Sequence, residues 1–186
     1  MEFLQLAVLA VVQGITEFLP VSSSAHLQLV PFLGAGPDQG LDIDIAVHVG
    51  SLLAVILYFL RDILRLAVGC VRSLRGKRNP DGRLAGLLIV ATLPAIVAGF
   101  VLYRLEPAFL RSIDVIIATT IGFALLLWVV DRNCMSVRRA EHMGLVDAVI
   151  IGLAQALALI PGTSRSGITM TAARMLGVER QEAARF

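Results

Sequence analysis

Apolar residues occur along this chain in runs that are long enough to cross a lipid bilayer. A spanning helix needs about 20 mostly apolar residues at a rise of about 1.5 Å per residue. Three stretches meet this closely: Ile43 to Leu60, Leu84 to Tyr103 and Ile113 to Val130. The pattern predicts an all-α, polytopic integral membrane protein that forms a single membrane domain over residues 1–186.

Two further apolar stretches, Phe3 to Leu19 and Leu145 to Ile160, are shorter, and each runs directly into a polar motif. No basic region precedes the first, so we expect it to be kept as structure and not removed as a signal peptide. The composition agrees with a membrane protein, because 57% of the residues are hydrophobic and only 16% are charged, against about 25% charged in soluble domains.

The basic residues are unevenly distributed between the connections. Seven of them fall between the first two spans, at Arg61, Arg65, Arg72, Arg75, Lys77, Arg78 and Arg83, whereas the connection from Arg104 to Ser112 carries two. The positive-inside rule makes the 61–83 loop cytoplasmic. Asp38, Asp42 and Asp44 then lie on the outer side. We expect no nucleic-acid partner, because a cytoplasmic membrane loop carries the same charges.

The two polar motifs resemble each other. LPVSSSAHL at 19–27 aligns with IPGTSRSGI at 160–168, and both follow a short apolar helix that contains a glutamine. Three spans separate the copies, and this odd number makes two helix-break-helix segments enter the bilayer from opposite faces. We therefore predict an inverted repeat of two re-entrant helical hairpins, with repeat one at about 1–83 and repeat two from about 145. The breaks predict a polar cavity.

The second motif has the groups of a phosphate site. Pro161 and Gly162 end one helix, and 163–167 offer hydroxyls and backbone N–H groups before the next, expected from Ile168 to Leu176. Arg165 supplies the positive charge. Ordinary helix capping explains the hydroxyls alone, but a buried arginine costs at least ~2.5–3.5 kcal/mol at the bilayer centre and marks a functional site.

The first motif offers groups for proton transfer and metal binding. Gln13 and Glu17 are four residues apart and share one helix face, and His26 follows three serines, Ser22, Ser23 and Ser24. A membrane carboxylate suits a proton relay, a cation ligand or a general base. Together the two motifs favour hydrolysis of a phosphate or diphosphate ester, with a divalent cation on Glu17 and phosphate oxygens.

Two other polar residues are expected to be structural. His48 lies inside the first span with no carboxylate near it in sequence, and we expect a packing or pore-lining role. Arg174 lies near the end of the last helix, and we expect it to extend its charge to the membrane interface.

The stretches QGITEFLPVSSSAHL (Gln13 to Leu27) and PGTSRSG (Pro161 to Gly167) closely resemble the signature motifs of the bacterial undecaprenyl pyrophosphate phosphatases, also known as bacitracin resistance proteins. The resemblance extends along the chain and includes an LPA turn at Leu93 to Ala95. It implies an inner-membrane hydrolase, with its active site open to the outer face, that converts the C55 isoprenoid diphosphate to the monophosphate carrier of peptidoglycan synthesis. It also implies a divalent cation, Mg²⁺ or Ca²⁺.

The resemblance implies roles for individual residues. Glu17, Ser23, His26 and Arg165 would be catalytic, and Glu17, with Gln13 as a second candidate, would hold the metal. The diphosphate would bind Ser22, Ser24, Thr163, Ser164, Arg165, Ser166 and Gly167. The nucleophile is left open between Ser23 and His26, and we prefer Ser23, with His26 and Glu17 handling protons and metal.

The chain departs from the family pattern in two ways. Many members have a glutamate where this chain has Gln13, so the metal charge falls on Glu17. Members also continue for several more membrane helices, so we expect this chain to be truncated at its C-terminal end. A membrane transporter or flippase of a lipid phosphate or small anion is the alternative function. The substrate and membrane lipids are the expected partners, and a homodimer is left open.

Overall fold

The computed structural model describes residues 3–33, 39–105, 112–135 and 137–186. Its elements in this part of the chain are helices, and the one β-bridge joins Arg138 to Val178. The helices are α1 Phe3–Thr16, α2 Ser23–Phe32, α3 Leu41–Tyr58, α4 Leu60–Leu74, α5 Pro80–Leu105, α6 Ile113–Asn133, η2 Ala140–His142, α7 Leu145–Leu157, α8 Arg165–Met175 and α9 Arg180–Arg185. The predicted all-α fold class is confirmed. Asp38 and residues 106–111 of the expected outer connection lie outside the described residues.

The helices include the predicted membrane spans. Within the described residues, α5 and α6 are each long and apolar enough to cross a bilayer, and α3 with α4 qualifies as a bent pair at an angle of 75°. Large apolar side chains point outward on all three, for example Leu57, Val97 and Trp128. The chain is therefore a multi-pass membrane protein, as its hydrophobic pattern predicts.

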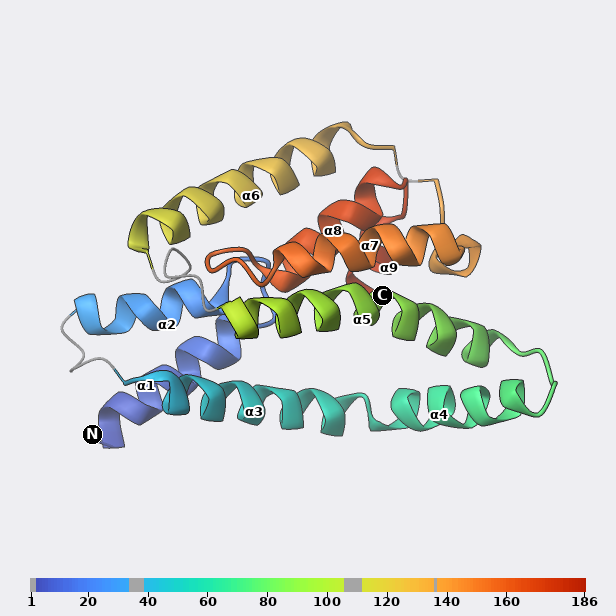
Figure 1. Ribbon diagram of the computed structural model, residues 1–186, viewed down its shortest axis with the longest axis horizontal. Coiled ribbons are helices and arrows are strands. Elements are labelled where there is room, and N and C mark those ends of the chain that lie inside the picture. The colour runs from blue at the N-terminus through green and yellow to red at the C-terminus, as the bar shows by residue number, and fades with distance from the viewer. Residues whose placement is uncertain (1–2, 34–38, 106–111, 136) are drawn as a thin grey trace.

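The basic segment 61–83 was expected to be a cytoplasmic loop. The loop conformation was wrong, and the side of the membrane on which the segment lies stays a prediction. Most of it is α4, which packs against the first turns of α5 (Figure 1). Gly69 and Gly82 permit this approach, because a Cβ on Gly69 would lie 2.7 Å from the backbone nitrogen of Gly82. The alternation of arginines with apolar residues at helical spacing, which makes α4 amphipathic, is the signal that was missed.

The expected turn at Leu93 to Ala95 is also absent, because Pro94 lies inside α5. The expected interfacial position of Arg174 is corrected as well. Its side chain is 3% exposed and donates to the carbonyl oxygens of Val178 and Cys134 and to the carboxylate of Asp131 on α6. Arg174 thus joins the end of α8 to the end of α6.

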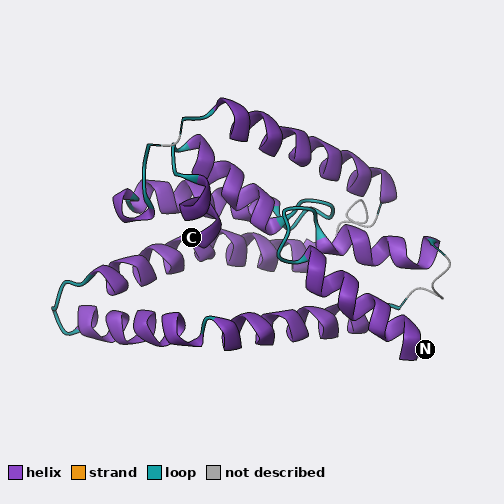
Figure 2. Cartoon of the chain, turned by 180° about the vertical axis from the view of Figure 1, so that it is seen from behind, coloured by secondary structure: helices purple, strands orange, loops and turns teal. Residues whose placement is uncertain are grey.

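Two helical hairpins meet at their tips in the middle of the molecule. The α1–α2 pair and the α7–α8 pair approach from opposite ends of the long axis, and the irregular segments between their helices lie together (Figures 1 and 2). The predicted pair of hairpins with meeting tips is confirmed. The bilayer face that each enters, and the repeat boundaries at about 83 and 145, stay predictions.

Packing behind the tips fixes the second hairpin. Leu87 and Ala91 of α5 pack with Ile151 of α7 and with alanines of α8 in one buried apolar cluster. Gly152 makes the helices approach closely, since a Cβ there would lie 2.5 Å from the carbonyl oxygen of Ala91. A second cluster, Leu9, Leu27 and Val30, holds α1 against α2. Each break therefore connects two helices that are held in place by apolar packing.

Candidate active site

The first break, Glu17 to Ser22, interrupts the first hairpin at Pro20. Ser22 adopts a left-handed backbone conformation with φ 61°, which costs a non-glycine residue roughly 1–2 kcal/mol. The carbonyl oxygen of Ser22 accepts from both the backbone N–H of His26, at 3.3 Å, and the ring Nδ1 of His26, at 2.8 Å. A carbonyl can only accept, so Nδ1 carries the proton. His26 thus stabilises the conformation of the first break.

The second break, Ala158 to Ser164, is held from the side by α6. Thr119 Oγ1 donates to the carbonyl oxygen of Pro161 at 2.6 Å, and Thr120 Oγ1 donates to that of Gly162 at 3.1 Å. Gly162 has φ 87°, and a Cβ there would collide with Thr119 Oγ1. Ser164 then caps α8 by accepting from the Gly167 N–H at 3.2 Å. Gly162 and Ser164 therefore direct Arg165 toward the first break.

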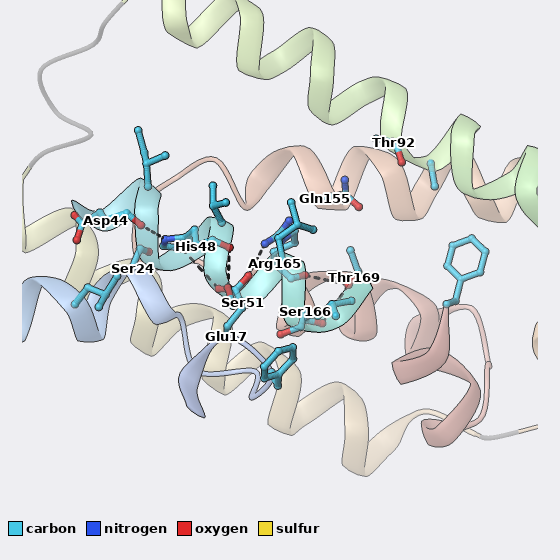
Figure 3. A pocket seen from close by; sticks show the side chains of 18 of the residues that line it. Glu17, Ser24, Asp44, His48, Ser51, Thr92, Gln155, Arg165, Ser166 and Thr169 are labelled. Carbon is cyan, nitrogen blue, oxygen red and sulfur yellow. Dashed lines mark hydrogen bonds and ion pairs between the residues drawn. The ribbon is translucent and has the colours of Figure 1, made fainter. Parts of the chain in front are cut away.

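Glu17 is the point where the two breaks meet. Its Oε1 lies 2.6 Å from an Nη of Arg165 (Figure 3). Its Oε2 accepts from Ser23 Oγ at 2.5 Å and from Gln13 Nε2 at 3.1 Å. A second contact between the breaks runs from Ser166 Oγ to the carbonyl oxygen of Leu19 at 3.4 Å. The predicted shared face of Gln13 and Glu17 is confirmed, as is the approach of the two motifs.

Sequence reasoning missed the contribution of α3 to this site. His48 Nε2 lies 3.7 Å from Glu17 Oε2, and Ser51 Oγ accepts from Gln13 Nε2 at 3.2 Å. Of the two roles expected for His48, pore lining is the one observed. Asp44, His48 and Ser51 form a polar stripe at intervals of four and three residues on an apolar span. Such a stripe marks a helix face turned toward a polar cavity.

Two cavities meet at Glu17. The smaller, about 360 Å³, is lined mostly by polar residues; predicted site residues that line it are Glu17, Ser22, Ser23, Ser24, Thr163, Ser164, Arg165 and Ser166. The larger, about 930 Å³, is mainly apolar and extends between α3, α5 and α7. Three predicted site residues, Gln13, His26 and Gly167, line neither cavity. The site therefore joins a polar pocket to an apolar one.

The metal-binding capacity of the site is limited. The described residues contain no group of three or more His, Cys, Asp or Glu side chains that could hold a metal ion. Gln13 is 1% exposed, and its Oε1 has no hydrogen-bond partner. An unpartnered buried oxygen next to a carboxylate fits a cation that takes further ligands from phosphate and water. Glu17 and Gln13 could thus share a cation with a bound substrate.

The arrangement can support phosphoryl transfer at the boundary of the two cavities. A serine hydroxyl lies at hydrogen-bond distance from a carboxylate, as a nucleophile and its base must. A guanidinium and the N-terminus of α8 provide donors for anionic oxygens. The apolar cavity suits a hydrocarbon chain attached to the phosphate. A phosphorylated lipid matches both pockets.

Comparison with known proteins gives the same picture. Residues 6–186 match the family described as "Bacitracin resistance protein BacA". "Undecaprenyl-diphosphatase 1" of Rhodospirillum rubrum is 52% identical over all of this chain and 68% of its own length. The "Undecaprenyl-diphosphatase" of Saccharophagus degradans is 53% identical over all of this chain and 70% of its own length, and that of Idiomarina loihiensis is 50% identical, with 71% of its length covered. The chain belongs to the bacitracin resistance protein BacA family.

Proposed function

We propose that this protein hydrolyses undecaprenyl diphosphate, releasing inorganic phosphate and leaving the lipid monophosphate. The observation that carries the proposal is the position of Glu17, which accepts from Ser23 of its own hairpin and pairs with Arg165 of the other. The names of the relatives identify the lipid diphosphate class. They do not favour the transporter or flippase alternative. In bacteria the monophosphate serves peptidoglycan synthesis, and its regeneration accounts for resistance to bacitracin.

Ser23 is the proposed nucleophile. Its Oγ donates to Glu17 Oε2 and lines the polar cavity, whereas His26 lines neither cavity. Ser23 Oγ would attack the distal phosphorus and pass its proton to Glu17, which would give that proton to the bridging oxygen as the lipid monophosphate leaves. Water would then attack the phosphoserine and pass a proton to Glu17, which would return it to Ser23 Oγ as inorganic phosphate is released. His26 keeps Ser22 in place in this scheme.

The second break would hold the diphosphate. One Nη of Arg165 is used by Glu17, and the remaining guanidinium N–H groups are available for phosphate oxygens. Thr163 is 5% exposed, and its Oγ1 has no hydrogen-bond partner. Ser164 and Ser166 lie beside it in the same cavity, with Ser22 and Ser24 on the facing hairpin. The positive charge of Arg165 and the hydrogen bonds of these hydroxyls would stabilise the negative charge that develops in the transition state.

A divalent cation, Mg²⁺ or Ca²⁺, completes the proposal. Glu17 and Gln13 Oε1 would hold it together with phosphate oxygens and water. When bound, it supplies positive charge that polarises the phosphoryl group. A single carboxylate supplies little negative charge for a cation held by the protein alone. This supports a cation that arrives bound to the diphosphate.

We place the protein in the bacterial cytoplasmic membrane with its site open to the outer face. The basic residues of α4 and of the turn that follows support a cytoplasmic position for that end. Asp44 and Gln28, at the other end of the apolar cavity, would then lie on the outer side. Surrounding membrane lipids are the remaining partners, and a homodimer stays open as an assembly.

The test is phosphate release from undecaprenyl diphosphate, or from a C15 analogue, by the purified protein in detergent. Wild type should release one phosphate per lipid, and Glu17→Ala and Arg165→Ala should be nearly inactive. Absence of release by wild type, together with uptake of the lipid into vesicles that contain the protein, would favour the transporter alternative. Unchanged release by either variant would contradict the site assignment.

A further inference from the structure

Two polar side chains outside both sequence motifs, those of His48 and Gln155, lie where the two cavities meet. The residues that line both cavities are Glu17, Ser24, His48, Gln155, Arg165 and Ser166. His48 is already engaged, because its Nδ1 donates to the carbonyl oxygen of Asp44 at 2.7 Å and its Nε2 faces Glu17. Gln155 therefore merits separate consideration.

Gln155 presents an uncommitted amide to this boundary. It lies on the apolar helix α7, and the hydrogen bonds of the described residues include none to its side chain. Figure 3 draws it on α7, apart from the dashed contacts of Glu17 and Arg165. Its side chain is partly buried and lines both cavities, so a ligand that enters either one can reach the amide. An amide held there is suited to a ligand that brings its own acceptor.

We propose that Gln155 donates a hydrogen bond to the proximal phosphate, the one that carries the lipid chain, and so orients the diphosphate. This inference rests on the proposed function. Ser23 and Thr163 line only the polar cavity, whereas Leu27 and Leu52 line only the apolar one. A lipid diphosphate that fills both places its distal phosphate beside Ser23 and its proximal phosphate at the boundary, where Gln155 lies.

The lipid monophosphate product keeps the proximal phosphate. A monophosphate inhibitor therefore reports on the proximal position, and inorganic phosphate reports on the distal one. Farnesyl monophosphate and inorganic phosphate would be measured as inhibitors of farnesyl diphosphate hydrolysis by wild type, Gln155→Leu and Gln155→Met. Both variants remove the amide and replace it with an apolar side chain that is compatible with helix α7. Gln181→Leu is the matched control, because Gln181 is exposed on α9 and lines neither cavity.

Loss of one hydrogen bond to a charged phosphate should raise the inhibition constant of farnesyl monophosphate about tenfold or more. The inhibition constant of inorganic phosphate, which binds in the distal position, should change less than about twofold in the same variants. Parallel changes in both constants, as a structural role predicts, or no change in either would overturn the assignment. Wild type that releases no phosphate would instead contradict the proposed function itself.

Discussion

An Nη of Arg165 lies 2.6 Å from Oε1 of Glu17, although 148 positions separate the two residues in the chain. Each side chain comes from the broken tip of a different helical hairpin, and the ion pair joins the tips. The same carboxylate accepts from Ser23 Oγ. One residue therefore connects the proposed nucleophile to the proposed phosphate-binding group, and the consequences can be tested residue by residue.

Glu17→Gln should abolish most of the activity without unfolding the protein. The amide can still accept from Ser23, but it cannot take the proton of the hydroxyl. We expect phosphate release to fall about 10²- to 10⁴-fold, the usual contribution of a general base. Glu141→Gln, an exposed change on η2, should leave the rate unchanged. A Glu17→Gln rate within twofold of wild type would exclude Glu17 as the base.

Arg165→Lys should show that charge alone is insufficient. A lysine keeps the positive charge but loses the planar fork that can bind Glu17 and phosphate together. We expect kcat/KM for a polyprenyl diphosphate to fall about 10- to 100-fold, as when one charge-assisted contact is lost. The exposed Arg185→Lys is the control. If Arg165→Lys and wild type had equal kinetics, simultaneous binding of Glu17 and phosphate by one guanidinium would not be needed.

Gly162→Ala should destabilise the second break. An alanine would be strained at φ 87°, and its Cβ would displace Thr119 Oγ1 from the carbonyl of Pro161. We expect a loss of about 1–3 kcal/mol in the free energy of unfolding, measured by thermal or denaturant unfolding in detergent. Gly86→Ala, where nothing lies within 4 Å of the added Cβ, should not destabilise the protein. A Gly162→Ala protein as stable as wild type would rule out this restraint.

Chelation of divalent ions should stop phosphate release, and Mg²⁺ or Ca²⁺ should restore it. Because Gln13 Oε1 is buried without a hydrogen-bond partner, on the residue whose Nε2 bonds Glu17, Gln13→Ala should raise the cation concentration for half-maximal activity about tenfold. Binding of the cation would also be followed by calorimetry with a non-hydrolysable diphosphate present. Full activity in chelator, or the same cation requirement in Gln13→Ala, would count against this site.

Much of the site follows from local sequence patterns. The spacing of Gln13 and Glu17 predicts a shared helix face, and their hydrogen bond at 3.1 Å confirms it. The similarity of the two motifs, with an odd number of spans between them, predicts that the tips meet, which the Glu17–Arg165 pair confirms. Such features are predictable because helix periodicity and bilayer crossing impose simple geometric rules.

The supporting residues could not be predicted in the same way. Thr119 and Thr120 look like ordinary polar residues in an apolar span, and only the packing of α6 on the second break gives them their carbonyl partners. His48 likewise gains its carboxylate neighbour from a different helix. The position of His26 outside both cavities depends on the left-handed backbone at Ser22, which no spacing rule predicts. Long-range contacts decide these cases.

The most direct test of a single site divided between two hairpins is a double-mutant cycle on Glu17→Gln and Arg165→Lys. If both side chains act on the same substrate as one unit, the double variant should lose much less activity than the product of the two single losses. That is the result predicted by the ion pair between the tips. Losses that multiply fully would show that Glu17 and Arg165 act independently, and would contradict the divided site.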